Sequence, residues 1–121
     1  MKRILISALL LFVASLAHGQ QIYRNAALTT TQVVQASQTN WYAYYVYNPN
    51  ATACSLDLFT TVSPTLGTTV PKVSLVIPPT TGANLTIPPT VFPNAMSVAA
   101  VTAAGGGTTC STGMTVNLWY Q

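Results

Sequence analysis

Charged residues are scarce in this sequence. They make up 4% of its 121 residues, against about a quarter in an ordinary soluble domain. The absence of Lys and Arg clusters excludes a DNA-binding domain, which needs basic side chains to neutralise phosphates. Because half of the residues are apolar, disorder is excluded as well. We therefore expect one small folded domain without a nucleic-acid partner.

The first 19 residues are typical of a secretory signal peptide. A basic start at residues 1–3 precedes an apolar run over 4–17, and Ala17 and Gly19 are the small residues that a signal peptidase requires. The apolar run has about 14 residues, whereas a membrane-spanning helix needs roughly 20. The sequence thus predicts cleavage before Gln20, a domain over 20–121 without a membrane span, and a secreted protein, extracellular or periplasmic.

Removal of such a leader also removes His18, the only histidine. The remaining chain has no glutamate, and its formal charges are Arg24 and Lys72 against Asp57. A Ser-His-Asp triad then lacks its base, and two-carboxylate glycoside hydrolysis lacks one acid. Zinc, calcium and magnesium sites lack ligands. We predict no enzyme activity, no metal and no cofactor.

Several segments alternate apolar and polar residues with period two, which predicts half-buried β-strands. In the clearest, Met114–Tyr120, Met114, Val116, Leu118 and Tyr120 share one face and Thr115, Asn117 and Trp119 the other. Further strands are expected over 27–35, 41–47, 55–60, 72–77, 83–87 and 96–102. Proline and glycine separate these segments. The sequence predicts an all-β single domain, an Ig-like or jelly-roll-like antiparallel β-sandwich of about seven strands.

A short motif occurs twice. Residues 77–80, Ile-Pro-Pro-Thr, recur at 87–90. We interpret the two copies as equivalent strand ends. The alternative is a Pro-rich ligand for an aromatic groove, although neither copy is a PxxP segment.

Cys54 and Cys110 are the only cysteines. In an oxidising compartment they are expected to form a disulfide. A bridge between them closes a long loop, which stabilises a small domain by about 4 kcal/mol in the chain-entropy estimate. The alternative is two free thiols buried as small apolar groups.

Five aromatic residues gather within one predicted strand, and they are Trp41, Tyr42, Tyr44, Tyr45 and Tyr47. Strict alternation places Trp41, Tyr45 and Tyr47 on one face and the other two on the opposite face. An exposed aromatic row stacks on sugar rings or anchors a protein partner. The alternative is a packed central strand. Asn50 and Asn84 begin N-glycosylation sequons, which matter only in a eukaryotic secretory pathway.

The segment Leu28–Val34 contains no charged residue. Charges normally protect exposed strand edges from pairing with other chains, and near-neutral proteins tend to associate. The segment is expected either to complete its own sheet or to add to the sheet of a neighbour. This pattern favours a homo-oligomer or a surface partner.

Four motifs resemble a group of small β proteins of phage and environmental origin. They are YYVYNPNAT at 44–52, LGTTVPKVSL at 66–75, the segment 77–85 and STGMT at 111–115. The resemblance covers about residues 28–120 and implies a compact sandwich with a non-enzymatic, virion-associated role. It carries no functional residues.

Together these observations predict a secreted, non-catalytic structural protein, self-associating or surface-associated, as a filament, coat or particle subunit. The alternative is an extracellular carbohydrate- or protein-binding module that uses Trp41–Tyr47.

Overall fold

The computed structural model describes residues 19–121, so the signal peptide expected at 1–19 lies outside the described residues apart from Gly19. The described chain forms eight β-strands. They are β1 (Gln21–Leu28), β2 (Gln32–Gln35), β3 (Thr39–Asn48), β4 (Cys54–Phe59), β5 (Val73–Ile77), β6 (Thr81–Phe92), β7 (Met96–Val101) and β8 (Met114–Tyr120). This part of the chain contains no helix long and apolar enough to cross a membrane.

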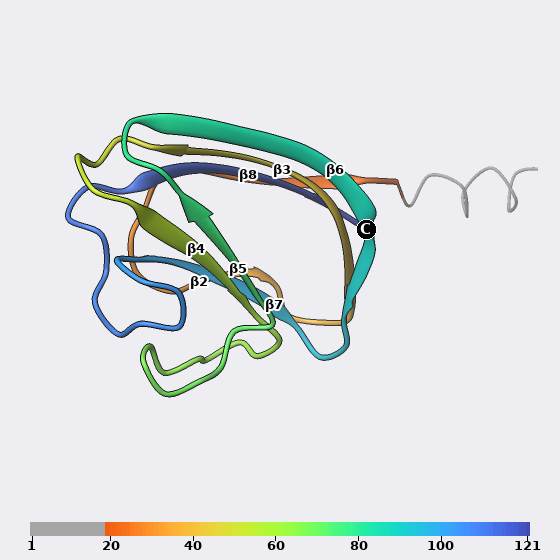
Figure 1. Ribbon diagram of the computed structural model, residues 1–121. Coiled ribbons are helices and arrows are strands. Elements are labelled where there is room, and N and C mark those ends of the chain that lie inside the picture. Colours follow the sequence, from red (N-terminus) through yellow and green to blue (C-terminus); the bar gives the residue numbers. More distant parts are fainter. Residues whose placement is uncertain (1–18) are drawn as a thin grey trace, which may run out of the picture.

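The strands form two four-stranded antiparallel sheets that pack face to face (Figure 1). The first sheet has the order β1-β8-β3-β6 and the second the order β2-β7-β4-β5. Pairing is nested: β1 pairs with β8, β2 with β7, β3 with β6 and β4 with β5. Eight strands nested in this way make a jelly roll. The expected all-β sandwich is confirmed, and its topology is the jelly-roll alternative.

The main core lies between the two sheets. Leu56 and Leu58 of the second sheet and Val116 and Leu118 of the first are fully buried in it. The alternation expected for β8 is confirmed, because every second residue from Met114 to Tyr120 is buried.

A second, smaller core lies on the outer side of the second sheet. Phe59, Ala99 and Val101 point away from the main core and pack with Leu66 from the loop between β4 and β5. Figure 1 shows the loops of residues 60–72 and 102–113 next to this sheet. The loops explain why every residue of β4 and β7 is buried.

The strand expected over 27–35 is wrong as a single element. Leu28 ends β1, and residues 29–31 cross to the second sheet, where β2 pairs with β7. The segment Leu28–Val34 therefore pairs within its own chain. Strand β1 lies at the edge of its sheet, and most of its residues are exposed. Its sequence therefore shows little of the alternation between apolar and polar residues from which a strand is predicted.

The two Ile-Pro-Pro-Thr motifs are not equivalent. Pro78 and Pro79 follow β5 and lead into a turn, as expected, but Pro88 and Pro89 lie inside β6. Between the pairs Trp41–Thr90 and Ala43–Thr86, three residues of β6 stand opposite one of β3. Proline is tolerated there because β6 is an edge strand and its ladder is interrupted at that point.

Candidate functional site

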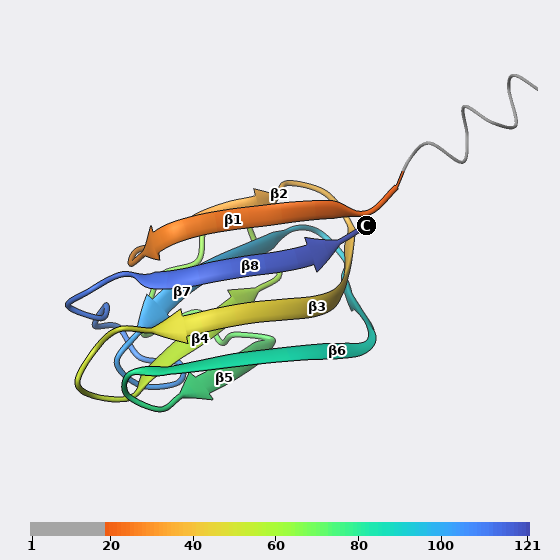
Figure 2. The ribbon, with the colours of Figure 1, turned by 90° about the horizontal axis from the view of Figure 1, so that it is seen from above.

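The two sheets differ in what covers their outer sides. Loops cover the second sheet, whereas the outer surface of the first sheet, here called the open face, carries no covering segment from residues 19–121 (Figures 1 and 2). Figure 2 looks onto this face, with β1, β8, β3 and β6 side by side. A ligand or partner therefore reaches the first sheet directly.

A β-bulge in β3 decides which aromatic side chains reach the open face. Trp41 pairs with Tyr120 and Ala43 with Trp119, so Tyr42 is an extra residue relative to β8. The extra residue shifts the alternation by one position. The indole N–H of Trp41 donates to the Ala43 carbonyl oxygen across the bulge, at 3.0 Å.

The bulge corrects the predicted division of the aromatic residues. Trp41 is 2% exposed and lies in the core, where its ring stacks on Tyr44 with centroids 5.7 Å apart. Tyr45 and Tyr47 point outward and are exposed. The prediction that Trp41 shares a face with Tyr45 and Tyr47 is wrong. It assumed strict alternation along the strand, and Tyr42 interrupts that alternation as an extra residue.

The register of the open face places amides and hydroxyls beside its aromatic side chains. Tyr45 stands between Asn117 on β8 and Asn84 on β6. Two residues before Tyr45 on β3, Ala43 stands between Trp119 on β8 and Thr86 on β6. Because Ala43 is small, the larger side chains around it leave a hollow above it. This hollow is a shallow groove of about 620 Å³, lined by Tyr42, Ala43, Tyr44, Tyr45, Asn84, Leu85, Thr86, Asn117 and Trp119.

The Tyr45 ring leans along the sheet toward β6. A β-carbon placed on Gly82, the residue opposite Tyr47, would lie 3.8 Å from the Tyr45 ring and hydroxyl. The absence of a side chain at Gly82 thus gives the ring space beside the strand. Tyr47 lies on the same face with similar exposure but does not line the groove.

Tyr42, which lines the groove, carries an unpaired polar group. Its hydroxyl is buried and has no hydrogen-bond partner among the described residues. Burial also raises the pKa of Tyr42 above its usual value near 10, because it disfavours the phenolate. A buried hydroxyl without a partner is uncommon in folded proteins and calls for an explanation.

Charge is nearly absent from the surface of the part of the chain that the structure describes. Within residues 19–121 the exposed charged side chains are Arg24 and Lys72. Asp57 is fully buried, where it accepts hydrogen bonds from Ser55 Oγ, Ser74 Oγ and the Gly105 N–H at 2.7–2.8 Å. This carboxylate anchors the loop of residues 102–113 to the second sheet. Among the described residues no three metal-ligating side chains come together.

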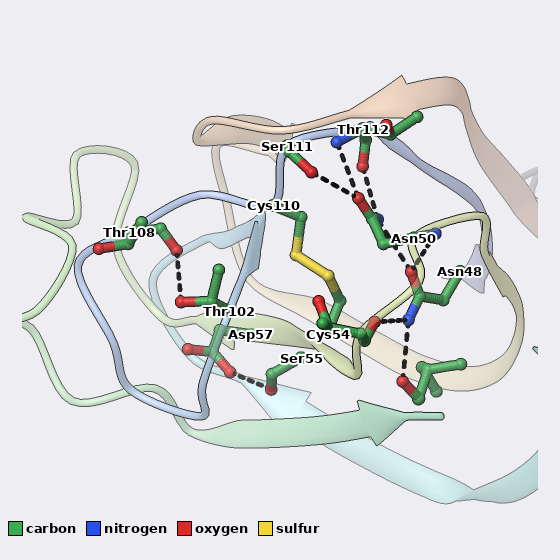
Figure 3. Close-up of a disulfide and its surroundings, with 12 residues drawn as sticks. Asn48, Asn50, Cys54, Ser55, Asp57, Thr102, Thr108, Cys110, Ser111 and Thr112 are labelled. Carbon is green, nitrogen blue, oxygen red and sulfur yellow. Dashed lines mark hydrogen bonds between the residues drawn. A yellow bond between two sulfur atoms is a disulfide. The ribbon is translucent and has the colours of Figure 1, made fainter. Parts of the chain in front are cut away.

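The expected disulfide is confirmed. Cys54 and Cys110 are bonded and buried, and they join the start of β4 to the loop that precedes β8 (Figure 3). The alternative of two free thiols is therefore wrong.

Asn50, one of the two sequon residues, is also buried near this disulfide (Figure 3). Its side-chain nitrogen donates to Asn48 Oδ1 and to the Thr112 carbonyl oxygen, at 2.9 and 2.8 Å. Both N–H groups of the amide are thereby used, so the fold leaves no room for a glycan on Asn50. Asn84 is exposed in the groove and stays a candidate.

Sequence reasoning found Tyr42, Tyr44 and Tyr45 but missed Asn84 as a groove residue, together with Thr86, Asn117 and Trp119. The outward alternation of β8 did indicate that Asn117 and Trp119 are accessible. Their proximity to Tyr45 depends on strand order, which no local pattern contains.

We compared the chain with family models, with curated proteins and with solved structures, and no match was found.

Proposed function

We propose that this protein is a secreted, non-catalytic structural subunit that associates with further copies of itself through the edge of β6. The observation that carries the proposal is the composition of this edge. Over Thr81–Ile87 it has no charged residue, and Leu85 is 55% exposed. A free edge presents unpaired N–H and C=O groups, and proteins that stay monomeric protect such edges with charge, proline or a bulge.

The protection present on β6 covers only part of the strand. Pro88 and Pro89 block pairing near its end, and Thr81–Ile87 has no such device. With Arg24 and Lys72 as the exposed charged side chains of residues 19–121, electrostatic repulsion between copies of this domain is weak. Backbone pairing between copies then extends the first sheet.

A secreted location is supported by the disulfide, which fits an oxidising compartment. A role on a particle surface is what the resemblance to phage and environmental β proteins implies. Pairing of β6 with β6 closes a two-fold dimer, whereas pairing of β6 with β1 of the next copy continues into a filament.

The test is sedimentation velocity of the purified protein over a range of concentrations. The native sequence should form larger species as concentration rises, with little dependence on salt because the contact is uncharged. Leu85→Lys places a charge on the edge and should leave a monomer. Val70→Lys is the matched control, because Val70 is an exposed valine in the loop between β4 and β5.

A native protein that stays monomeric at its highest soluble concentration contradicts the proposal. Equal association of the Leu85→Lys and native proteins contradicts the assignment to β6. Negative-stain microscopy of the associated species then distinguishes a closed dimer from a filament.

A further inference from the structure

We propose that the groove on the open face is a binding site for an uncharged sugar ring of a glycan. The site does not depend on self-association, because pairing through the edge of β6 extends the sheet and leaves the open face uncovered. Its volume of about 620 Å³ lies within the range of about 300–1,000 Å³ typical of small-molecule sites.

The aromatic side chains provide the apolar contact that a sugar ring requires. One side of a pyranose ring is a patch of C–H groups, which packs on an indole or phenol ring. Trp119 stands beside Ala43 in the register, and Tyr45 lines the same groove with its ring leaning toward Gly82. A sugar ring in the groove therefore has the Trp119 indole beside Ala43 and the Tyr45 phenol in the same lining.

The polar side chains beside these rings match the hydroxyl groups of a sugar. Asn84, Asn117 and Thr86 offer amide and hydroxyl groups, each of which both donates and accepts. The amides of Asn48 and Asn50 are fully used inside the protein. Asn84 and Asn117, by contrast, have no side-chain hydrogen bond within residues 19–121, so their bonding capacity is available to a ligand.

The unpaired hydroxyl of Tyr42 is an independent observation that points to a ligand. Tyr42 lines the same groove, and its hydroxyl oxygen is buried and has no hydrogen-bond partner among the described residues. A rotation of the Tyr42 side chain toward the groove would let a sugar hydroxyl supply the missing partner. A buried polar group without a partner destabilises the protein, so the ligand would relieve a cost present in the free protein.

The charge around the groove favours an uncharged sugar. None of the groove residues is charged, and the nearest cation by register is Arg24, which stands opposite Asn117 on β1. One guanidinium at the rim does not form the basic surface that nucleic acids or sulfated polymers require. Neutral polysaccharides therefore fit better than acidic ones.

The test uses protein from a host that does not glycosylate Asn84, because a glycan there would fill the groove. Binding is measured by affinity electrophoresis in gels that contain soluble neutral glucan, xylan or glycol chitin, with alginate as the acidic arm. We expect retardation by at least one neutral polymer. Tyr45→Ala should weaken this retardation by about tenfold, the upper end for one aromatic contact.

Tyr47→Ala is the matched control. Tyr47 lies two residues from Tyr45, on the same face and with 36% against 38% exposure. It is outside the groove, so its removal should leave retardation unchanged. Equal losses in the two variants would assign binding to the open face in general and contradict the groove.

Tryptophan fluorescence supplies a second readout on the native protein. The chain has two tryptophans, of which Trp41 is buried in the core and Trp119 lines the groove. A hexasaccharide of the retarding polymer should shield Trp119 from acrylamide quenching. Tyr42→Phe should be at least as stable as the native protein, because its hydroxyl has no partner in the fold, and should bind several-fold more weakly.

Three results would overturn the proposal. One is the absence of retardation by every neutral polymer, and another is retardation by alginate alone. The third is loss of self-association in Tyr45→Ala without any sugar binding, which would make the groove a contact between copies.

Discussion

At the scale of single residues, a small set of buried neutral side chains connects the loops of this poorly charged protein. Asn48 is fully buried and donates to the carbonyl oxygens of Thr52, Ile77 and Pro78. Its side-chain oxygen accepts from the backbone and the side chain of Asn50. Asn50 continues the network to Thr112 in the loop before β8. Two neutral amides thus connect three loops, a task that ion pairs perform in more highly charged proteins.

The two sequon asparagines should respond in opposite ways to substitution. Asn50→Ala removes contacts to Asn48, Ser111 and Thr112 and leaves buried groups without partners. At about 1 kcal/mol for each hydrogen bond, the free energy of unfolding should fall by about 2–4 kcal/mol. Asn84→Ala, at an exposed position, should change it by less than about 0.5 kcal/mol. Urea denaturation followed by fluorescence measures both, and equal midpoints would contradict the network.

At the scale of strands, a strand could be predicted where apolar and polar residues alternate clearly within its own segment of the sequence. Met114–Tyr120 is predicted with its correct ends and faces because it is a central strand with one buried side. The ends of β6 were missed because Pro88 and Pro89 indicate a stop in any local interpretation. The division of the aromatic residues in β3 was wrong because a bulge adds a residue without a distinct sequence signal. The groove needs Tyr45, Asn84 and Trp119 together, and the topology alone brings them together.

A close approach between β1 and the chain entering β8 produces the next prediction. The β1–β8 register shifts between Asn25 and Leu28, where Asn25 Oδ1 accepts from the Ala27 N–H at 2.9 Å. A β-carbon on Gly113 would overlap the backbone of Ala27. Gly113→Ala must therefore displace one strand, and we expect a loss of about 1–3 kcal/mol in the free energy of unfolding.

Gly82→Ala is the control for this substitution. A β-carbon on Gly82 would meet Val46 O at 3.7 Å, an ordinary contact. Thermal unfolding by circular dichroism should separate the two variants clearly. If Gly113→Ala unfolds at the same temperature as the native protein, the junction of β1 and β8 is loosely packed and the prediction is wrong.

At the scale of the whole molecule, the disulfide connects parts that the hydrogen-bond ladders leave separate. The ladders run within each sheet, and the sheets adhere mainly through their apolar faces. Cys54 belongs to the second sheet, whereas Cys110 lies in the loop that leads into β8 of the first. The Cys110 N–H also donates to the Ala100 carbonyl oxygen of β7, at 3.0 Å. The bridge thus limits how far the two sheets can separate at this end of the sandwich.

The bridge spans a sequence separation of 56 residues, for which the chain-entropy estimate is about 4 kcal/mol. Small domains have free energies of unfolding of about 5–15 kcal/mol, so this one bond is a large part of the total. The double variant Cys54→Ala/Cys110→Ala should lose about that amount in guanidinium denaturation. The native protein in excess reductant is the matched control and should unfold at nearly the same midpoint. A double variant as stable as the oxidised native protein would mean that the nested strand pairing alone holds the two sheets together.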